Sequence, residues 1–126
     1  MTYLKSYKEL IVWQKSIVLV EKIFLLTSKF PQSELYGIVS QMRRAAIAIP
    51  SNIAEGYGRR SSKEYAQYYA IAYGSGLELE TQLIIAKKLN LTKESFLFKE
   101  SEDLLNEVLR MLNVMSSKMK QLNASR

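Results

Sequence analysis

The side chains best suited to chemistry lie in the segment IPSNIAEGYGRRSSKEY, residues 49–65, where three cations stand close to tyrosines. Arg59, Arg60 and Lys63 could hold phosphate groups, and the neighbouring aromatic rings could stack on unpaired bases. The alternative is structural, because tyrosines at helical spacing often fill a core and an arginine pair can settle the end of a helix. The sequence leaves both interpretations open.

Two further basic sets are candidates for phosphate contact. Arg43 and Arg44 lie shortly before this segment, and Lys15, Lys22 and Lys29 repeat every seven residues. The whole chain has 18 Lys and Arg against 12 Asp and Glu, which is a net charge of +6. A positive balance favours a polyanionic partner such as RNA or DNA, although charge alone is not a specific signal.

Composition excludes several classes of chemistry. The 126 residues include no cysteine and no histidine, so disulfides, thiolates, the usual zinc sites and imidazole catalysis are ruled out. Carboxylates such as Glu78 and Glu80 lack the histidine partners found in di-iron bundles, and GYGRRSS lacks the spacing of a P-loop. We therefore predict no enzymatic activity, no metal site and no cofactor.

The cellular setting is predicted from the same composition. The absence of cysteine fits a reducing cytoplasm. Charges interrupt every apolar stretch before it reaches the length of a bilayer span, and Lys15, Glu21 and Lys22 break the first apolar segment, where a signal peptide would lie. We expect a cytoplasmic protein with no membrane partner.

Hydrophobic periodicity places these residues on helices. Apolar residues recur at alternating spacings of three and four, and no strand pattern competes with them. One domain is expected over residues 1–126, with helices at about 8–29, 33–57, 62–89 and 93–122. Long helices joined by short connections predict an all-α fold, an antiparallel up-down-up-down four-helix bundle.

Helix starts and one interruption can also be predicted. Ser33, Ser61 and Thr92 are expected N-caps, and Ser61 forms a capping box with Glu64. Pro50 lies inside the second helix, but the apolar stripe keeps its phase on both sides of it. We therefore expect one helix kinked at Pro50 rather than two separate helices.

The first helix has more apolar surface than a monomeric bundle can bury. Its predicted core stripe consists of Leu10, Trp13, Ile17, Val20 and Phe24. Two further apolar columns repeat every seven residues beside that stripe: Ile11, Val18 and Leu25, and Val12, Leu19 and Leu26. Since a helix packed on one side needs about three apolar columns in seven, we expect the surplus columns to meet another subunit. The alternative is that loops or the N-terminal segment cover them.

Two glycines in the middle of the third helix require a separate explanation. Gly74 and Gly76 should each cost about 1 kcal/mol relative to alanine, so another group should approach the backbone closely there. A facing helix, from the same chain or a neighbouring one, is the favoured explanation, and a small-molecule pocket is the other.

Three segments in order carry a resemblance to a known family: YKELIVWQKS at 7–16, QMRRAAIAIPSNIAEGYGRR at 41–60 and EYAQYYAIAYGSGLELETQL at 64–83. They resemble the four-helix-bundle proteins encoded in intervening sequences of bacterial 23S rRNA genes, over nearly the whole chain. That family is similar to the accessory proteins of diversity-generating retroelements, which form pentameric barrels and bind nucleic acid. The resemblance implies a ring-like homo-oligomer, expected to be a pentamer, with no known enzymatic activity and an RNA or DNA partner.

The family motif falls on Asn52, Glu55, Gly56, Gly74, Ser75, Glu78 and Gln82. We interpret these positions as structural. Asn52 lies on the packing seam between helices, and its side-chain amide could form a hydrogen bond with Ser75 or Gln82 of the facing helix. Glu55 can pair with Arg59 four residues later, and Gly56 allows two helices to meet closely. The motif would then specify architecture, and the cations would make the phosphate contacts.

Two functions from different classes fit these observations. The leading hypothesis is a homo-oligomeric accessory protein that binds RNA or DNA, and in a ring the repeated cations would produce a stronger field than one chain has. The alternative is a protein-interaction scaffold that does not bind nucleic acid. Salt dependence distinguishes the two, because binding to phosphates weakens steeply as salt is added.

Overall fold

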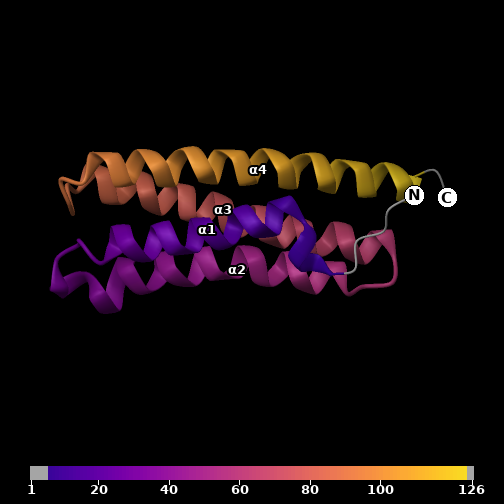
Figure 1. Ribbon diagram of the computed structural model, residues 1–126, viewed down its shortest axis with the longest axis horizontal. Coiled ribbons are helices and arrows are strands. Elements are labelled where there is room, and N and C mark those ends of the chain that lie inside the picture. The colour runs from indigo at the N-terminus through magenta and orange to yellow at the C-terminus, as the bar shows by residue number, and fades with distance from the viewer. Residues whose placement is uncertain (1–5, 125–126) are drawn as a thin grey trace.

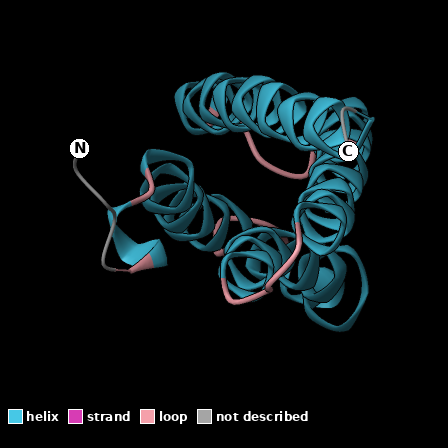
Figure 2. Cartoon of the chain, turned by 90° about the vertical axis from the view of Figure 1, so that its right-hand side faces the viewer, coloured by secondary structure: helices cyan, strands magenta, loops and turns pink. Residues whose placement is uncertain are grey.

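The computed structural model describes residues 6–124, with side chains for 6–118. Four long helices are present: α1 (Ile11–Thr27), α2 (Ser40–Tyr57), α3 (Ser62–Lys88) and α4 (Ser95–Ala124). Figure 2 shows them joined by short loops, with no strand among the described residues. The predicted all-α fold of four helices is confirmed.

Three short elements precede the first two long helices. A 3₁₀ turn, η1 (Tyr7–Glu9), comes before α1, and a second, η2 (Gln32–Glu34), follows Pro31. A π-helical segment, η3 (Leu35–Val39), then runs directly into α2. Gly37 leaves the helical region inside η3, at φ −113° and ψ −115°. The entrance to α2 is therefore an irregular stretch of backbone.

The predicted helix starts have different outcomes. Ser61 caps α3 as predicted, since its Oγ accepts a hydrogen bond from the Glu64 backbone N–H at 3.2 Å. Thr92 accepts a bond from the N–H of Glu94 just before α4. The prediction for Ser33 is wrong, because Ser33 lies inside η2 and α2 continues from η3 without a side-chain cap.

The long helices lie side by side along one axis of the molecule (Figure 1). The α1–α2 and α3–α4 connections lie at one end of the molecule, and the α2–α3 connection lies at the other. α1 packs against α2 and α4, and α3 packs against the same two helices. α2 and α4 therefore share both of their neighbours.

α2 continues through Pro50 as a single helix, and Pro50 itself is buried. A proline disturbs the hydrogen bonds of the turn before it. The next two side chains donate back to that turn: Ser51 Oγ to the Ile47 carbonyl and Asn52 Nδ2 to the Ala48 carbonyl, both at 2.8 Å. The expectation of one helix rather than two holds, and the kink stays a prediction.

The buried face of α1 is shifted from the predicted one: Leu10, Trp13 and Val20 of the predicted stripe are half-buried against the core, at its edge. Val12, Leu19 and Leu26, which were expected to meet another subunit, are at most 1% exposed and belong to the chain's own core. Phe24, which was expected in the core, is 36% exposed. The prediction is wrong in phase because α1 is apolar nearly all round, so periodicity does not define one buried face. Because α1 packs against both α2 and α4, the column of Val12, Leu19 and Leu26 becomes the buried one.

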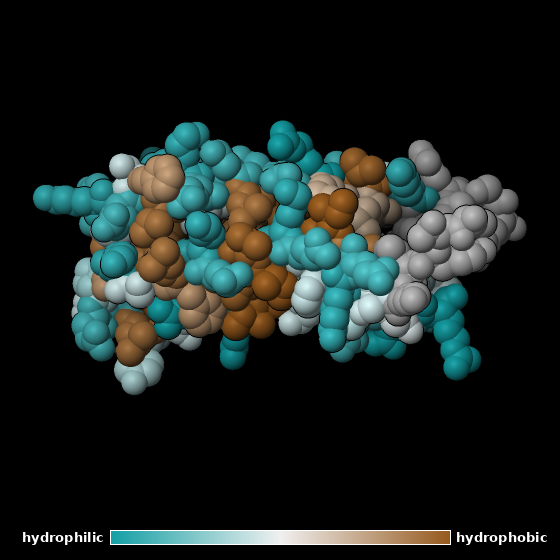
Figure 3. Space-filling model, in the orientation of Figure 1, coloured by the Kyte–Doolittle hydropathy of each residue, from teal (hydrophilic) through white to brown (hydrophobic). Residues whose placement is uncertain are grey.

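Only one of the two surplus columns remains on the outside. Ile11, Val18 and Leu25 are 59%, 42% and 45% exposed. Figure 3 shows apolar side chains gathered on the face of the molecule that includes α1 and α2. The apolar surplus of α1 is therefore present but smaller than the sequence suggests.

Candidate nucleic-acid interface

Arg59 is held between α2 and α3 where these two helices are joined, in a region that we call the arginine corner (residues 55–69). Its guanidinium donates to the Glu55 carboxylate at 2.8 Å and to the Tyr68 hydroxyl, and it lies 4.6 Å from the centre of the Tyr68 ring. The hydrogen bond with Glu55 raises the pKa of Arg59 above its ordinary value. The predicted pair of Glu55 with Arg59 is present, so this charge already has a protein partner.

The tyrosines of the arginine corner also have structural roles. A Cβ at Gly56 would lie 2.9 Å from the Cβ of Tyr68, so α2 and α3 meet closely there because position 56 has no side chain. Tyr65 donates its hydroxyl hydrogen to the Tyr57 carbonyl at 2.8 Å. Tyr69 is buried, and its burial raises its pKa to about 12. For these rings the structural interpretation is favoured.

Two of the three lysines in the lysine stripe (Lys15, Lys22 and Lys29) already form ion pairs. Lys15 pairs with Glu107 at 2.8 Å and Lys22 pairs with Glu100 at 3.3 Å, so both lysines connect α1 to α4. Lys29 is exposed. Partly exposed pairs of this kind contribute at most about 1 kcal/mol each, but they reduce the positive charge that α1 offers to a ligand.

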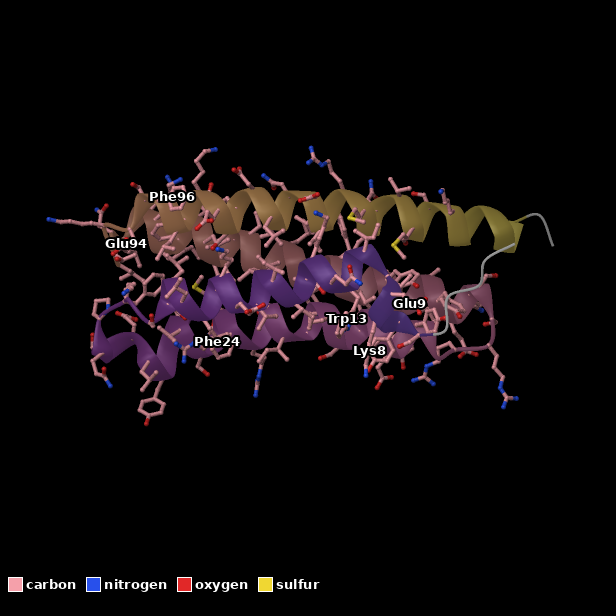
Figure 4. All side chains as sticks on the ribbon, viewed as in Figure 1. Lys8, Glu9, Trp13, Phe24, Glu94 and Phe96 are labelled. Atoms are coloured by element: carbon pink, nitrogen blue, oxygen red, sulfur yellow. The ribbon has the colours of Figure 1, made fainter. Side chains whose placement is uncertain are left out.

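The second arginine pair lies near the beginning of α2. Arg43 Nε donates to the buried Thr27 Oγ1 at 3.0 Å, and the Arg43 guanidinium lies 4.6 Å from the centre of the Phe24 ring. Figure 4 shows Phe24 towards one end of α1 and Trp13 towards the other. Arg44 is exposed and forms no ion pair with a described residue. Arg43 therefore ties α2 to α1, whereas Arg44 remains available.

An open groove of about 500 Å³ lies beside this second pair, and we call it the Tyr36 groove. It is lined by Leu35, Tyr36, Val39, Ser40, Arg43, Arg44 and Ile47. Tyr36 is 94% exposed. Sequence reasoning missed Tyr36 because it lies off the apolar stripe of the second predicted helix. Its position directly before Gly37, at the entrance to that helix, was the available signal.

The two mid-helix glycines of α3 differ. A Cβ at Gly76 would lie 2.5 Å from Cδ2 of Leu109 on α4, so the predicted close approach is present at this position. A Cβ at Gly74 would have no neighbour within 4 Å in the described part of the chain, so a close approach there by a neighbouring chain stays a prediction. The packing of α3 against α4 therefore depends on one of the two glycines.

The amide pairing predicted across the helices is not formed. Asn52 Nδ2 bonds within α2, to Ala48, instead of to Ser75 or Gln82. Gln82 is buried and its Nε2 donates to Glu78 Oε1 at 3.4 Å, within α3. Gln82 Oε1 has no hydrogen-bond partner among the described atoms. The hydrogen bonds of Asn52 and Gln82 therefore stay within their own helices.

Charge is distributed unevenly over the helices. Residues 40–63 have five basic side chains and one acidic one: Arg43, Arg44, Arg59, Arg60 and Lys63 against Glu55. Residues 93–107 have two basic and five acidic side chains: Lys93 and Lys99 against Glu94, Glu100, Glu102, Asp103 and Glu107. Three of these acids pair with lysines of α1 and α3. Positive charge therefore concentrates on α2 and the start of α3.

The described part of the chain has neither a cluster of metal ligands nor a helix that could span a membrane. No group of three or more acidic side chains there could hold a metal ion. None of the described helices combines the length and apolar character needed to cross a bilayer. The surface features that stand out are the cations of residues 40–63 and the exposed apolar side chains.

Four long helices packed around a leucine-rich core define a small four-helix protein. Within that class, the chain belongs to the 23S rRNA-intervening sequence protein family, whose model matches residues 8–114. The match extends from η1 into α4 and includes all of the candidate cations. No match was found among curated proteins.

Proposed function

We propose that this protein is a non-enzymatic homo-oligomer that binds RNA or DNA through the basic surface of α2 and the start of α3. The observation that carries the proposal is the contrast between paired and unpaired cations. Arg44, Arg60 and Lys63 are exposed and form no ion pair with a described residue, whereas Lys15 and Lys22 pair with acids of α4. Cations without protein partners are the ones that can neutralise phosphates.

The candidate phosphate contacts can be ranked on this basis. Arg44, Arg60 and Lys63 come first, and the exposed Lys29 extends the set. Arg43 uses its Nε for Thr27, which leaves the outer N–H groups of its guanidinium for a phosphate. Arg59 ranks lower because Glu55 and Tyr68 already occupy one of its nitrogens.

Fluorescence anisotropy of labelled RNA and DNA, titrated over a range of salt concentrations, tests this ranking. Replacing Arg44, Arg60 and Lys63 by glutamine should weaken binding and make the log–log salt slope shallower by about 2 to 3. The matched control replaces Lys15, Lys22 and Lys87, which all have acidic partners, and it removes the same formal charge. The control should keep the wild-type slope.

Two results would contradict the proposal. The first is a wild-type protein that binds neither RNA nor DNA at low salt. The second is an equal loss of binding in the two triple variants, because only net charge would then matter and no binding surface would be defined.

Homo-oligomerisation is supported by the outer face of α1. Ile11, Val18 and Leu25 leave large apolar areas in water, and burying exposed side chains of this size contributes up to about 1.5 to 3 kcal/mol each. A ring of five copies, which the resemblance to retroelement accessory proteins implies, would place five α2 surfaces on one particle. Repeating the cations five times would strengthen the positive electrostatic field of the particle and its avidity for a polyanion.

Sedimentation velocity tests the oligomer directly. Val18→Ser combined with Leu25→Ser should shift the wild-type oligomer towards smaller species, because it removes apolar area from the outer face only. Phe96→Ser with Val114→Ser is the matched control, since these α4 side chains are 70% and 53% exposed. A wild-type chain that sediments as a monomer at micromolar concentration would overturn this part of the proposal.

A second candidate function, a protein-interaction scaffold, is favoured by one feature. An open and largely apolar groove of about 370 Å³ between α1 and α2 is lined by Tyr7, Trp13, Ile17, Val20, Ile47, Pro50, Ser51 and Ala54. A polypeptide could bury apolar side chains there. The scaffold predicts no nucleic-acid binding by the wild type and a protein complex that tolerates high salt.

A further inference from the structure

Tyr36 is an aromatic ring displayed to solvent beside cations. It is 94% exposed, and it belongs to the π-helical segment η3, just before the non-helical Gly37. Short π-helical segments occur frequently at functional sites. A ring that contributes no packing to the core needs another explanation, and its place on the edge of a 500 Å³ groove supplies one.

The polar groups of the Tyr36 groove suit an anion. Arg43 and Arg44 line it, and Ser40 adds an exposed hydroxyl. Arg43 is held in place by Thr27 and Phe24, so little side-chain entropy is lost when its outer N–H groups meet a ligand. One acid lies close by: the Glu34 carboxylate would be 3.6 Å from a Cβ at Gly37. The residues that line the groove themselves include two cations and no acid.

The aromatic rings of the arginine corner are committed elsewhere. Tyr68 lies under the Arg59 guanidinium, Tyr69 is buried, and Tyr65 is bonded to the Tyr57 carbonyl. Basic charge is therefore present at both ends of α2, but an uncommitted aromatic face is found beside it at the Tyr36 groove.

We propose that the Tyr36 groove holds an unpaired nucleotide, with its base stacked on the Tyr36 ring and its phosphate against Arg44 and Arg43. The inference rests on the proposed nucleic-acid binding and narrows it to RNA or DNA with single-stranded segments. Bases inside a duplex are already stacked on each other and do not offer a free face to a protein ring. Stacking tolerates any base, so little sequence preference is expected.

The test compares a short fluorescein-labelled single strand with the same strand annealed to its complement, as RNA and as DNA, by anisotropy. Tyr36→Ala should weaken single-strand binding by about 5- to 150-fold and leave duplex binding unchanged within about twofold. Tyr36→Phe should bind like the wild type, because it keeps the ring. Phe96→Ala is the matched control: Phe96 is 70% exposed but lies near Glu94 at the start of α4 (Figure 4).

The possible outcomes separate the two proposals. If the wild type binds no oligonucleotide, the proposed function fails and this inference fails with it. If the wild type binds the single strand but Tyr36→Ala binds it equally well, or weakens single strand and duplex alike, the function stands and the stacking site is wrong. The exposure of Tyr36 means that its removal should leave the circular dichroism spectrum unchanged.

A second measurement locates the base directly. A single strand that contains 4-thiouridine, cross-linked by ultraviolet light and analysed by mass spectrometry, should attach to the peptide that contains Tyr36. Cross-links confined to the arginine corner or to the lysine stripe of α1 would overturn the assignment, even if the binding data alone agreed with it.

Discussion

The arginine corner and the Tyr36 groove lie towards opposite ends of α2, have the same kinds of side chain and use them differently. At the corner, Arg59 bonds Glu55 and Tyr68, and Gly56 permits a close approach of α2 and α3. At the groove, Tyr36 is exposed and Arg44 forms no ion pair within the described chain. The same chemistry therefore builds architecture at one end and offers a surface at the other.

The difference teaches how the family motif should be interpreted. The most distinctive stretch of the sequence, NIAEGYGRR at 52–60, specifies a helix corner in which Asn52, Glu55 and Arg59 have protein partners, whereas Arg60 stays exposed. Groups that already have partners contribute stability, and a ligand must displace those partners before it binds. The comparison predicts that substitutions of the paired corner residues change stability, and that substitutions of the exposed residues, at the groove or at Arg60 and Lys63, change binding.

Among these substitutions, Gly56→Ala should lower the stability of the protein most. Its Cβ would lie 2.9 Å from the Cβ of Tyr68, an atom fixed to the α3 backbone, so the helices must move apart. Overpacking of this kind costs about 1 to 3 kcal/mol, measured as a lower urea midpoint. Gly74→Ala is the control, because position 74 is open and alanine should stabilise α3 by up to about 1 kcal/mol. Equal effects of the two substitutions would show that the corner is not tightly packed.

The second effect depends on pH. The folded pKa of Tyr69 is about 12, above the ordinary value of about 10, so the folded state binds the hydroxyl proton more tightly. This stabilisation is complete below pH 10 and is lost as the pH rises through 12, by on the order of 2 kcal/mol. Tyr69→Phe should flatten the decline in unfolding free energy between these pH values. Tyr36→Phe, at the groove, should leave the decline unchanged, and a flattening there would break the comparison.

The third effect concerns helix starts. Ser61 accepts a hydrogen bond from the first turn of α3, so Ser61→Ala should cost about 1 kcal/mol, and Ser61→Asp should restore most of it. Ser33→Ala, near the groove, should change the urea midpoint little, because Ser33 caps no helix. A loss at Ser33 comparable with the loss at Ser61 would mean that the entrance to α2 is held as firmly as the corner.

The success of sequence-based prediction follows the same division. Features set by short-range rules were predicted: the four helices, the Ser61 cap, the ion pair of Glu55 with Arg59 and the close approach at Gly56. Each of these depends on residues a few positions apart or on the size of one side chain. The corner could therefore be inferred in some detail before any coordinates were known.

The remaining features depend on information that periodicity does not contain. The buried face of α1 was misassigned because several apolar columns compete, and only its contacts with both neighbouring helices choose Leu19 over Phe24. The π-helical entrance to α2 is indicated in the sequence only by Gly37, and this irregular entrance explains both the wrong prediction for Ser33 and the omission of Tyr36. The groove is the part of the candidate site that required the structure.

The smallest expected effect, and the sharpest probe of the comparison, is that of Glu55→Gln. The Glu55 side chain is 57% exposed, so the loss of its charge should shift the urea midpoint less than Ser61→Ala does. The substitution also releases Arg59 and removes the one acid of residues 40–63, which makes the corner more like the groove. RNA affinity at low salt should rise by about twofold to threefold. The control is Glu107→Gln, which releases Lys15 on α1 and should raise the RNA affinity less. Weaker RNA binding by Glu55→Gln would contradict this expectation and would mean that the intact pair of Glu55 with Arg59 is itself part of the RNA contact.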